Sequence, residues 1–316
     1  MKEPSREFCV LYSPELGDYA FDDPHPFSHA RLPAFWKEFV SRGLDRRAAV
    51  EAPEMCDEAA LREFHTKDYV EFVKAASVHG DGYLDYGDTP AFKGVFEAAS
   101  RVVGATLKAV RVVMDRRYAR AFCPLGGLHH ARRERAGGFC VFNDIGVAIE
   151  HLRKTYGIRR IAYVDIDAHH GDGVYYPFES DPDLFIADIH EDGKFLYPGT
   201  GSSDETGSGA AQGTKLNLPM PPGASEKAFM DAFAEALRFI DKHQPEFVLL
   251  QCGADSLAGD PIAGLRFSPA CHGYAAQQLR NLAGKHAEGR LIAMGGGGYN
   301  LSNIAAAWCA VVEALV

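Results

Sequence analysis

The segment from Asp165 to Asp172 carries three carboxylates and two imidazoles within eight residues, directly after the apolar run 161–164. In an extended chain alternate side chains share a face, so Asp165, Asp167 and His169 are expected to point the same way. Carboxylates and an imidazole at this spacing suit a divalent ion such as Zn²⁺, Mn²⁺ or Fe²⁺. A merely polar strand end would not need five ionisable groups, so the sequence predicts a metal site here.

Three further clusters of reactive side chains follow other apolar runs of the chain. They are the pair His129-His130, the turn that contains Asp255, and Tyr299 behind four consecutive glycines. Taken singly, the histidine pair also fits ordinary packing, and the glycine run also fits a plain turn or a phosphate loop. Ligands of parallel α/β sheets bind beyond the carboxyl ends of the strands. We therefore expect all four clusters to meet at one edge of a sheet.

Short apolar runs alternate with longer amphipathic stretches along the chain. Strands are predicted at 8–12, 120–123, 161–167, 184–189, 247–251 and 291–294. Helices are predicted between them at 59–76, 92–114, 144–156, 226–243, 269–282 and 303–316. This alternation predicts an α/β fold with a parallel sheet and helices on both faces. No linker or repeat interrupts the pattern, so residues 1–316 are expected to form a single domain.

Composition narrows the classes of partner. The formal net charge of −10 disfavours a nucleic-acid binder, which needs a basic surface. It suits a cationic partner such as a lysine-rich tail or a polyamine. The need for solubility alone would also explain a charge of this size. The seven Cys are odd in number and widely spaced, which favours reduced thiols in the cytoplasm over a disulfide framework. The polar N-terminus lacks the apolar core of a signal peptide, and no apolar run has the length of a membrane span.

The side chains at the predicted sheet edge divide into two groups. Asp167 and His169 supply two metal ligands, and Asp255, after a glycine-containing turn, is the natural third. Three protein ligands leave one position open for water, as a catalytic site requires.

The second group lies beside that ion. His129 and His130 titrate near neutral pH, and Asp165 and Asp172 are expected to fix the tautomers of these imidazoles. The glycines deliver Tyr299, a phenol suited to hydrogen-bonding a developing oxyanion. The residues alone thus predict a catalytic metal centre.

Five motifs carry a resemblance to a known family. They lie at Pro124–Ala131, Gly137–Asp144, Val164–Val174, Leu250–Asp260 and Gly295–Leu301. Together they resemble the zinc-dependent histone deacetylase family, including its bacterial acetoin-utilisation members, and most closely its class I pattern. The similarity extends from Tyr12-Ser13-Pro14 and His25-Pro26 to the C-terminal helix.

The resemblance implies an arginase-like α/β fold with a central, mostly parallel sheet of about eight strands. It implies removal of acetyl or longer acyl groups from the side-chain amine of lysine in proteins. One Zn²⁺ per chain, replaceable by Fe²⁺ or Co²⁺, would bind Asp167, His169 and Asp255. The implied catalytic residues are His130 with Asp172 as general base and acid, His129 with Asp165 as a mainly electrostatic pair, and Tyr299 as polariser of the scissile carbonyl.

The resemblance also implies residues that contact the substrate. They are Phe139 and Tyr197 as walls of an acyl-lysine tunnel, Gly138 and Gly297 against the substrate amide and stem, Ile262 at the mouth, Asp88 at the rim, and Arg31 in an internal acetate channel. Two positions depart from the family pattern: Tyr197 stands where Phe is common, and Asp188 stands where a small Ser is usual beside a structural potassium ion. The resemblance therefore supports zinc more directly than potassium.

Other functions of the same residues stay open. An acetylpolyamine or small-metabolite amide would use the same core chemistry. A binuclear manganese ureohydrolase shares the implied fold but needs a second Asp near Asp255, where Gly253 and Leu257 stand. A non-catalytic acyl-lysine binder would be expected to lose Tyr299 or one of the two imidazoles. Neither nucleic acid nor a membrane is an expected partner.

Overall fold

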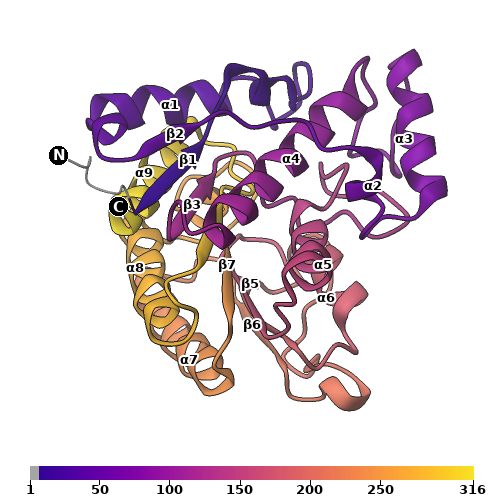
Figure 1. Cartoon of the computed structure of the whole chain (residues 1–316). Helices are drawn as coiled ribbons and strands as arrows, with labels where there is room; N and C mark the ends of the chain where they lie inside the picture. The colour runs from indigo at the N-terminus through magenta and orange to yellow at the C-terminus, as the bar shows by residue number, and fades with distance from the viewer. Residues whose placement is uncertain (1–6) are drawn as a thin grey trace.

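Eight strands form one sheet at the centre of the computed structural model, which describes residues 7–316 (Figure 1). The strands are β1 (Phe8–Leu11), β2 (Ala49–Glu51), β3 (Arg120–Cys123), β4 (Ile161–Asp165), β5 (Leu184–Glu191), β6 (Lys215–Met220), β7 (Phe247–Gln251) and β8 (Leu291–Met294). Their order is β2-β1-β3-β8-β7-β4-β5-β6, and every neighbouring pair in the described chain is parallel. The predicted fold class is confirmed.

Helices cover both faces of this sheet. They are α1 (Arg31–Ser41), α2 (Glu58–Leu61), α3 (Lys67–His79), α4 (Val95–Met114), α5 (Asp144–Tyr156), α6 (Asp172–Tyr175), α7 (Glu226–His243), α8 (Pro269–His286) and α9 (Leu301–Leu315). On one face α8 packs against α7 and α9, and α9 against α1; on the other, α4 packs against α3 and α5 (Figure 1). Strands β4 and β7 are buried along their whole length, which explains why each is apolar up to its last residue, Asp165 or Gln251.

Four adjacent strands bring the reactive segments to one edge. The order β3-β8-β7-β4 is contiguous in the sheet. Cys123 at the end of β3 pairs with Met294 of β8, and Asp165 at the end of β4 pairs with Gln251 of β7. The strands therefore end at similar heights, and the segments that follow them emerge side by side.

Strand β4 ends at Asp165, two residues before the predicted end at Asp167. Beyond it the carboxylates bend the chain: Oδ1 of Asp165 accepts a hydrogen bond from the backbone N–H of Asp167, and Oδ1 of Asp167 accepts one from that of His169, each at 3.0 Å. Such bonds compete with the strand ladder. The prediction that the chain stays extended through this segment is therefore wrong.

Sequence reasoning missed both edge strands and the first helix. β2 has only three residues, and β6 contains Pro219, a residue that sheets accept mainly at their edges. The predicted helix at 59–76 is in fact two helices. Thr66 starts the second, because its Oγ1 accepts a hydrogen bond from the backbone N–H of Tyr69 at 3.4 Å.

The structure bears on the predictions about free thiols and about membrane-spanning segments. All seven cysteines are free, as expected. No helix within residues 7–316 is long and apolar enough to cross a membrane. The prediction about a signal peptide concerns mainly residues 1–6, which lie outside the described residues.

Candidate active site

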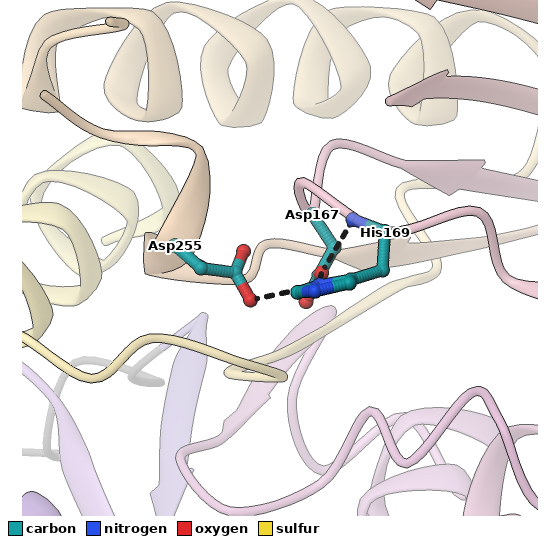
Figure 2. A group of neighbouring side chains, drawn as sticks. All are labelled: Asp167, His169 and Asp255. Carbon is teal, nitrogen blue, oxygen red and sulfur yellow. Dashed lines mark hydrogen bonds and ion pairs between the residues drawn. The ribbon is translucent and has the colours of Figure 1, made fainter. Parts of the chain in front are cut away.

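The three predicted metal ligands meet beyond the ends of β4 and β7 (Figure 2). Asp167 and His169 follow β4, and Asp255 lies in the 3₁₀ turn η5 (Ala254–Ser256) after β7. One candidate ligand atom from each residue lies within 4.8 Å of the other two. Nδ1 of His169 is 3.0 Å from Oδ1 of Asp167 and 3.3 Å from Oδ2 of Asp255. All three side chains are buried.

This cluster fits a divalent ion. Oδ2 of Asp255 is buried and faces Nδ1 of His169 at 3.3 Å, but it accepts no hydrogen bond of good geometry from the described residues. A Cβ atom on Gly253 would collide with Oδ2 of Asp167, and one on Gly297 with Oδ2 of Asp255. Both turns therefore need glycine to let the carboxylates converge. Two carboxylates and one imidazole with an unsatisfied oxygen among them are the donor set of a catalytic metal site.

The pKa values of all three side chains in this cluster are shifted by burial and by their mutual charges. Burial and the charge of Asp167 raise the pKa of Asp255. Burial opposes ionisation of Asp167 as well, but His129 and His169 hold its pKa well below the usual range. For His169 burial opposes the cation, yet the two carboxylates that it faces raise its pKa. A metal ion must therefore displace a proton from His169.

A glutamine at the end of β7 orients the ligands. Nε2 of Gln251 donates to Oδ2 of Asp167 at 2.8 Å, and Oε1 of Gln251 accepts from the backbone N–H of Gly253 at 2.7 Å. The same Asp167 oxygen accepts from the backbone N–H of Gly297 at 3.0 Å. Contacts of this kind fix the direction of ligand lone pairs.

Two histidine–carboxylate pairs lie beside the cluster. Nδ1 of His129 is 2.8 Å from Oδ2 of Asp165, and Nδ1 of His130 is 2.7 Å from Oδ1 of Asp172. The two Nε2 atoms are 3.1 Å apart. Each carboxylate holds one ring nitrogen, so the other nitrogen of each imidazole is directed away from it, toward the neighbouring ring.

The two pairs differ in their surroundings. Nη2 of Arg132 donates to the second oxygen of Asp172 at 2.7 Å. Burial, and then the charge of His129, lower the pKa of His130 to about 4. Burial acts on His129 too, but the charge of Asp165 in particular raises its pKa to about 9. The pKa of His129 therefore lies above neutral pH and that of His130 below it.

Aromatic rings border the cluster. The ring of Tyr299 meets that of Phe139 edge-on, with centroids 5.7 Å apart. Burial, and then the charge of Asp255, raise the pKa of the Tyr299 phenol well above its usual value, so it stays a hydrogen-bond donor. The ring of Tyr197 lies 5.0 Å from that of His130 and remains 44% exposed. It is therefore open to a ligand that approaches from outside.

Backbone strain places the Phe139 ring. Phe139 has φ +69°, a left-handed conformation that aromatic residues rarely adopt. Its N–H donates to Oγ1 of Thr89 at 3.1 Å, and its carbonyl accepts from the hydroxyl of Tyr19 at 2.8 Å. The preceding Gly138 has φ +51°, and a Cβ there would collide with the ring of His130.

Two other predicted substrate residues, Asp88 and Ile262, are partly or fully exposed. Asp88 is exposed, and its carbonyl oxygen is 3.2 Å from Nε2 of His25. The His25 ring in turn packs against Phe139, with centroids 4.5 Å apart. Ile262 is 36% exposed, and its backbone N–H donates to Oδ1 of Asp260 at 3.0 Å.

Arg31 binds the backbone of residues 295–298, the glycine segment. It is 1% exposed and donates from Nε to the carbonyl of Gly298 at 2.9 Å and from Nη2 to that of Gly296 at 2.6 Å. Its guanidinium stacks over Phe27 at 3.8 Å. These contacts hold the glycine segment in place. They do not test the predicted role of Arg31 in an acetate channel, which stays a prediction.

Both carboxylate oxygens of Asp188 have hydrogen-bond partners within the protein. Its Oδ1 is 2.7 Å from Nδ1 of His190, and its Oδ2 accepts from the backbone N–H of Gly171 at 2.9 Å. Nε2 of His190 is 2.9 Å from the carbonyl of Gly201. Because both ring nitrogens face acceptors, His190 is a cation here. The potassium ion stays a prediction.

The described site stands within a segment that matches a family model. Residues 25–315 match the histone deacetylase domain. The chain belongs to the histone deacetylase family. This membership supports a deacetylase, a hydrolase that acts on an acetylated substrate.

Individual members of the family are similar over almost the whole chain. The acetoin utilization protein AcuC of Bacillus subtilis (strain 168) is 36% identical over 304 residues, which is 94% of this chain and 78% of the relative. Histone deacetylase 6 of Arabidopsis thaliana is 33% identical over 96% of this chain and 65% of its own length. The crystal structure of the HDA15 HD domain superposes with a TM-score of 0.90 at 28% identity, covering 98% of this chain and 89% of that one. The arginase-like histone deacetylase fold is confirmed.

Sequence reasoning missed three polar side chains of this histone deacetylase site. Gln251 breaks an apolar run just before the motif with Asp255, which is a signal that could have been used. Arg132 follows the histidine pair, and Asp260 closes the Asp255 motif, but neither position reveals its partner. Their contacts depend on how loops from different strands meet.

Proposed function

We propose that this chain is a zinc-dependent amidohydrolase that removes acetyl or longer acyl groups from lysine side chains of proteins. One observation carries the proposal: a three-ligand cluster converges with two histidine–carboxylate pairs at one sheet edge. Two carboxylates and an imidazole suit Zn²⁺, and Fe²⁺ or Co²⁺ would substitute. We further propose a single catalytic domain that acts in the cytoplasm, where free thiols persist.

The protein side chains would move the proton. Asp167, His169 and Asp255 would hold the metal ion, which when bound would polarise the amide carbonyl and lower the pKa of a water molecule. His130 would take the proton of the attacking water at Nε2, because its Nδ1 faces Asp172. The same nitrogen would then give this proton to the leaving amine.

Two further groups would stabilise the developing negative charge. His129 lies next to His130, with the two Nε2 atoms 3.1 Å apart. As an imidazolium it would offset the negative charge of the oxyanion at short range. The phenol of Tyr299 would donate a hydrogen bond to the oxyanion. Phe139 and Tyr197 would line the acyl-lysine stem, with Gly138 and Gly297 beside it, Ile262 at the mouth and Asp88 at the rim.

The rival functions have less support. An acetylpolyamine or metabolite amide would meet the same core groups, so it remains the second candidate substrate. A binuclear ureohydrolase would need more ligands than the single group of three that residues 7–316 provide. A non-catalytic binder would not need the cationic and neutral imidazoles that His129 and His130 supply.

The hydroxyl of Tyr299 provides the test of the proposed reaction. Tyr299→Phe keeps the ring on Phe139 and removes only the oxyanion donor, so kcat on an acetyl-lysine peptide should fall by about 10²–10³. KM, metal content and Tm should change little. Tyr274→Phe, at a residue 38% exposed on α8, is the matched control. A lower Tm with unchanged kcat would show that Tyr299 only packs.

A further inference from the structure

A buried carboxylate joins the backbone of Ile262 to the backbone of Tyr299. Asp260 is 8% exposed. Its Oδ2 accepts a hydrogen bond from the backbone N–H of Tyr299 at 2.9 Å, and its Oδ1 accepts one from that of Ile262 at 3.0 Å. We infer that Asp260 is a positioning residue that fixes the backbone from which the Tyr299 phenol projects. This inference rests on the proposed function, in which that phenol is the oxyanion donor.

The position of Tyr299 depends on this bond because a flexible joint precedes it. Gly298 has φ +119°, a conformation open mainly to glycine. Its carbonyl is anchored by Nε of Arg31 at 2.9 Å. The N–H of that same planar peptide belongs to Tyr299 and is the group that Asp260 holds, so Arg31 and Asp260 bind opposite edges of one peptide unit. Without Asp260 only the single bond from Arg31 would hold this peptide, so it could turn about the backbone bonds of Gly298 and carry the phenol with it.

The loop at 258–264, the mouth loop, has other anchors. Nδ2 of Asn303 donates to the carbonyl of Ala258 at 3.2 Å. Oε2 of Glu191 accepts from the backbone N–H of Gly264 at 2.7 Å. These bonds hold both ends of the mouth loop independently of Asp260. Removal of the Asp260 carboxylate should therefore loosen the backbone of Tyr299 more than it loosens the mouth loop.

A double-mutant cycle tests the inference. Asp260→Asn keeps the shape but turns one acceptor into a donor that faces a backbone N–H. In the otherwise native chain kcat should fall about 10- to 100-fold, a part of the loss expected when the donor is removed. In a Tyr299→Phe background the same change should cost less than about 2-fold, because there is no hydroxyl left to misplace. A trifluoroacetyl-lysine peptide, a more reactive amide, keeps the weak variants measurable.

Controls separate positioning from folding. Asn303→Ala removes another anchor of the mouth loop without touching the Tyr299 N–H, and it should leave kcat within about 3-fold. If Asp260→Asn does not fold, Asp260→Glu, which keeps the charge but displaces the oxygens, should show the same dependence on the hydroxyl. Equal losses of kcat in both backgrounds would overturn the inference. A wild-type chain without activity on any acyl-lysine peptide would instead overturn the proposed function.

A spectroscopic readout does not depend on turnover. With 3-fluorotyrosine placed at position 299, metal-free wild-type protein should give one narrow ¹⁹F resonance. Asp260→Asn should shift or broaden it, whereas Asn303→Ala should not. An unchanged resonance in Asp260→Asn would mean that the phenol is held by other contacts, and the inference would fail.

Discussion

Asp255→Ala is expected to remove both the bound metal ion and all measurable turnover. Asp255 is one of only three side chains in the cluster, and its buried Oδ2 accepts no hydrogen bond from the described residues. Two remaining ligands would leave the ion poorly held. Metal analysis of purified protein and initial rates on an acetyl-lysine peptide check both parts. Asp231→Ala, at an exposed position of α7, should change neither.

Metal binding to the wild-type chain should also show a pH signature. Burial raises the pKa of Asp255, and two carboxylates raise that of His169, so protons compete with a metal ion for both groups. Metal loading must release these protons, and the apparent affinity should therefore fall as pH falls. Full activity of Asp255→Ala, or zinc affinity that rises at low pH, would contradict this account of the cluster.

His130→Ala should lower kcat by about 10²–10⁴, the range typical of a general acid–base group. His130 is the neutral imidazole of the two, since burial lowers its pKa to about 4. His129→Ala should cost less, because the charge of Asp165 raises the pKa of His129 to about 9 and favours an electrostatic role over proton transfer. Asp172→Asn should lower kcat too, since it removes the acceptor at Nδ1 of His130. All three variants should keep their metal ion.

Metal analysis and kcat together decide between roles for the two imidazoles. If either histidine variant lost its metal ion, that imidazole would be a ligand. If His129→Ala cost more than His130→Ala, the assignment of the proton-transfer role would be reversed.

The general position of the site could be predicted from sequence because every reactive segment follows an apolar run. Strands of one parallel sheet end at one edge, so Asp167, Asp255 and Tyr299 could be placed together without a structure. The edge strands β2 and β6 could not be predicted from sequence, because β2 is very short and β6 contains a proline.

The finer geometry could not be predicted because it depends on bonds between loops. The end of β4 at Asp165 is set by carboxylates that bind backbone N–H groups of the residues that follow. The link from Asp260 to the backbone of Tyr299 spans 39 positions of sequence. The opposite pKa shifts of His129 and His130 follow from their neighbours in space, which spacing along the chain does not reveal.

The most direct test is hydrolysis of acyl-lysine peptides by the wild-type chain before and after chelation. Acetyl and longer acyl peptides should be assayed beside acetylpolyamines. The proposal predicts turnover of an acyl-lysine peptide that a chelator abolishes and Zn²⁺, Co²⁺ or Fe²⁺ restores. Turnover of acetylpolyamines alone would retain the chemistry but change the substrate. Full activity in protein shown to be free of metal would contradict the central claim.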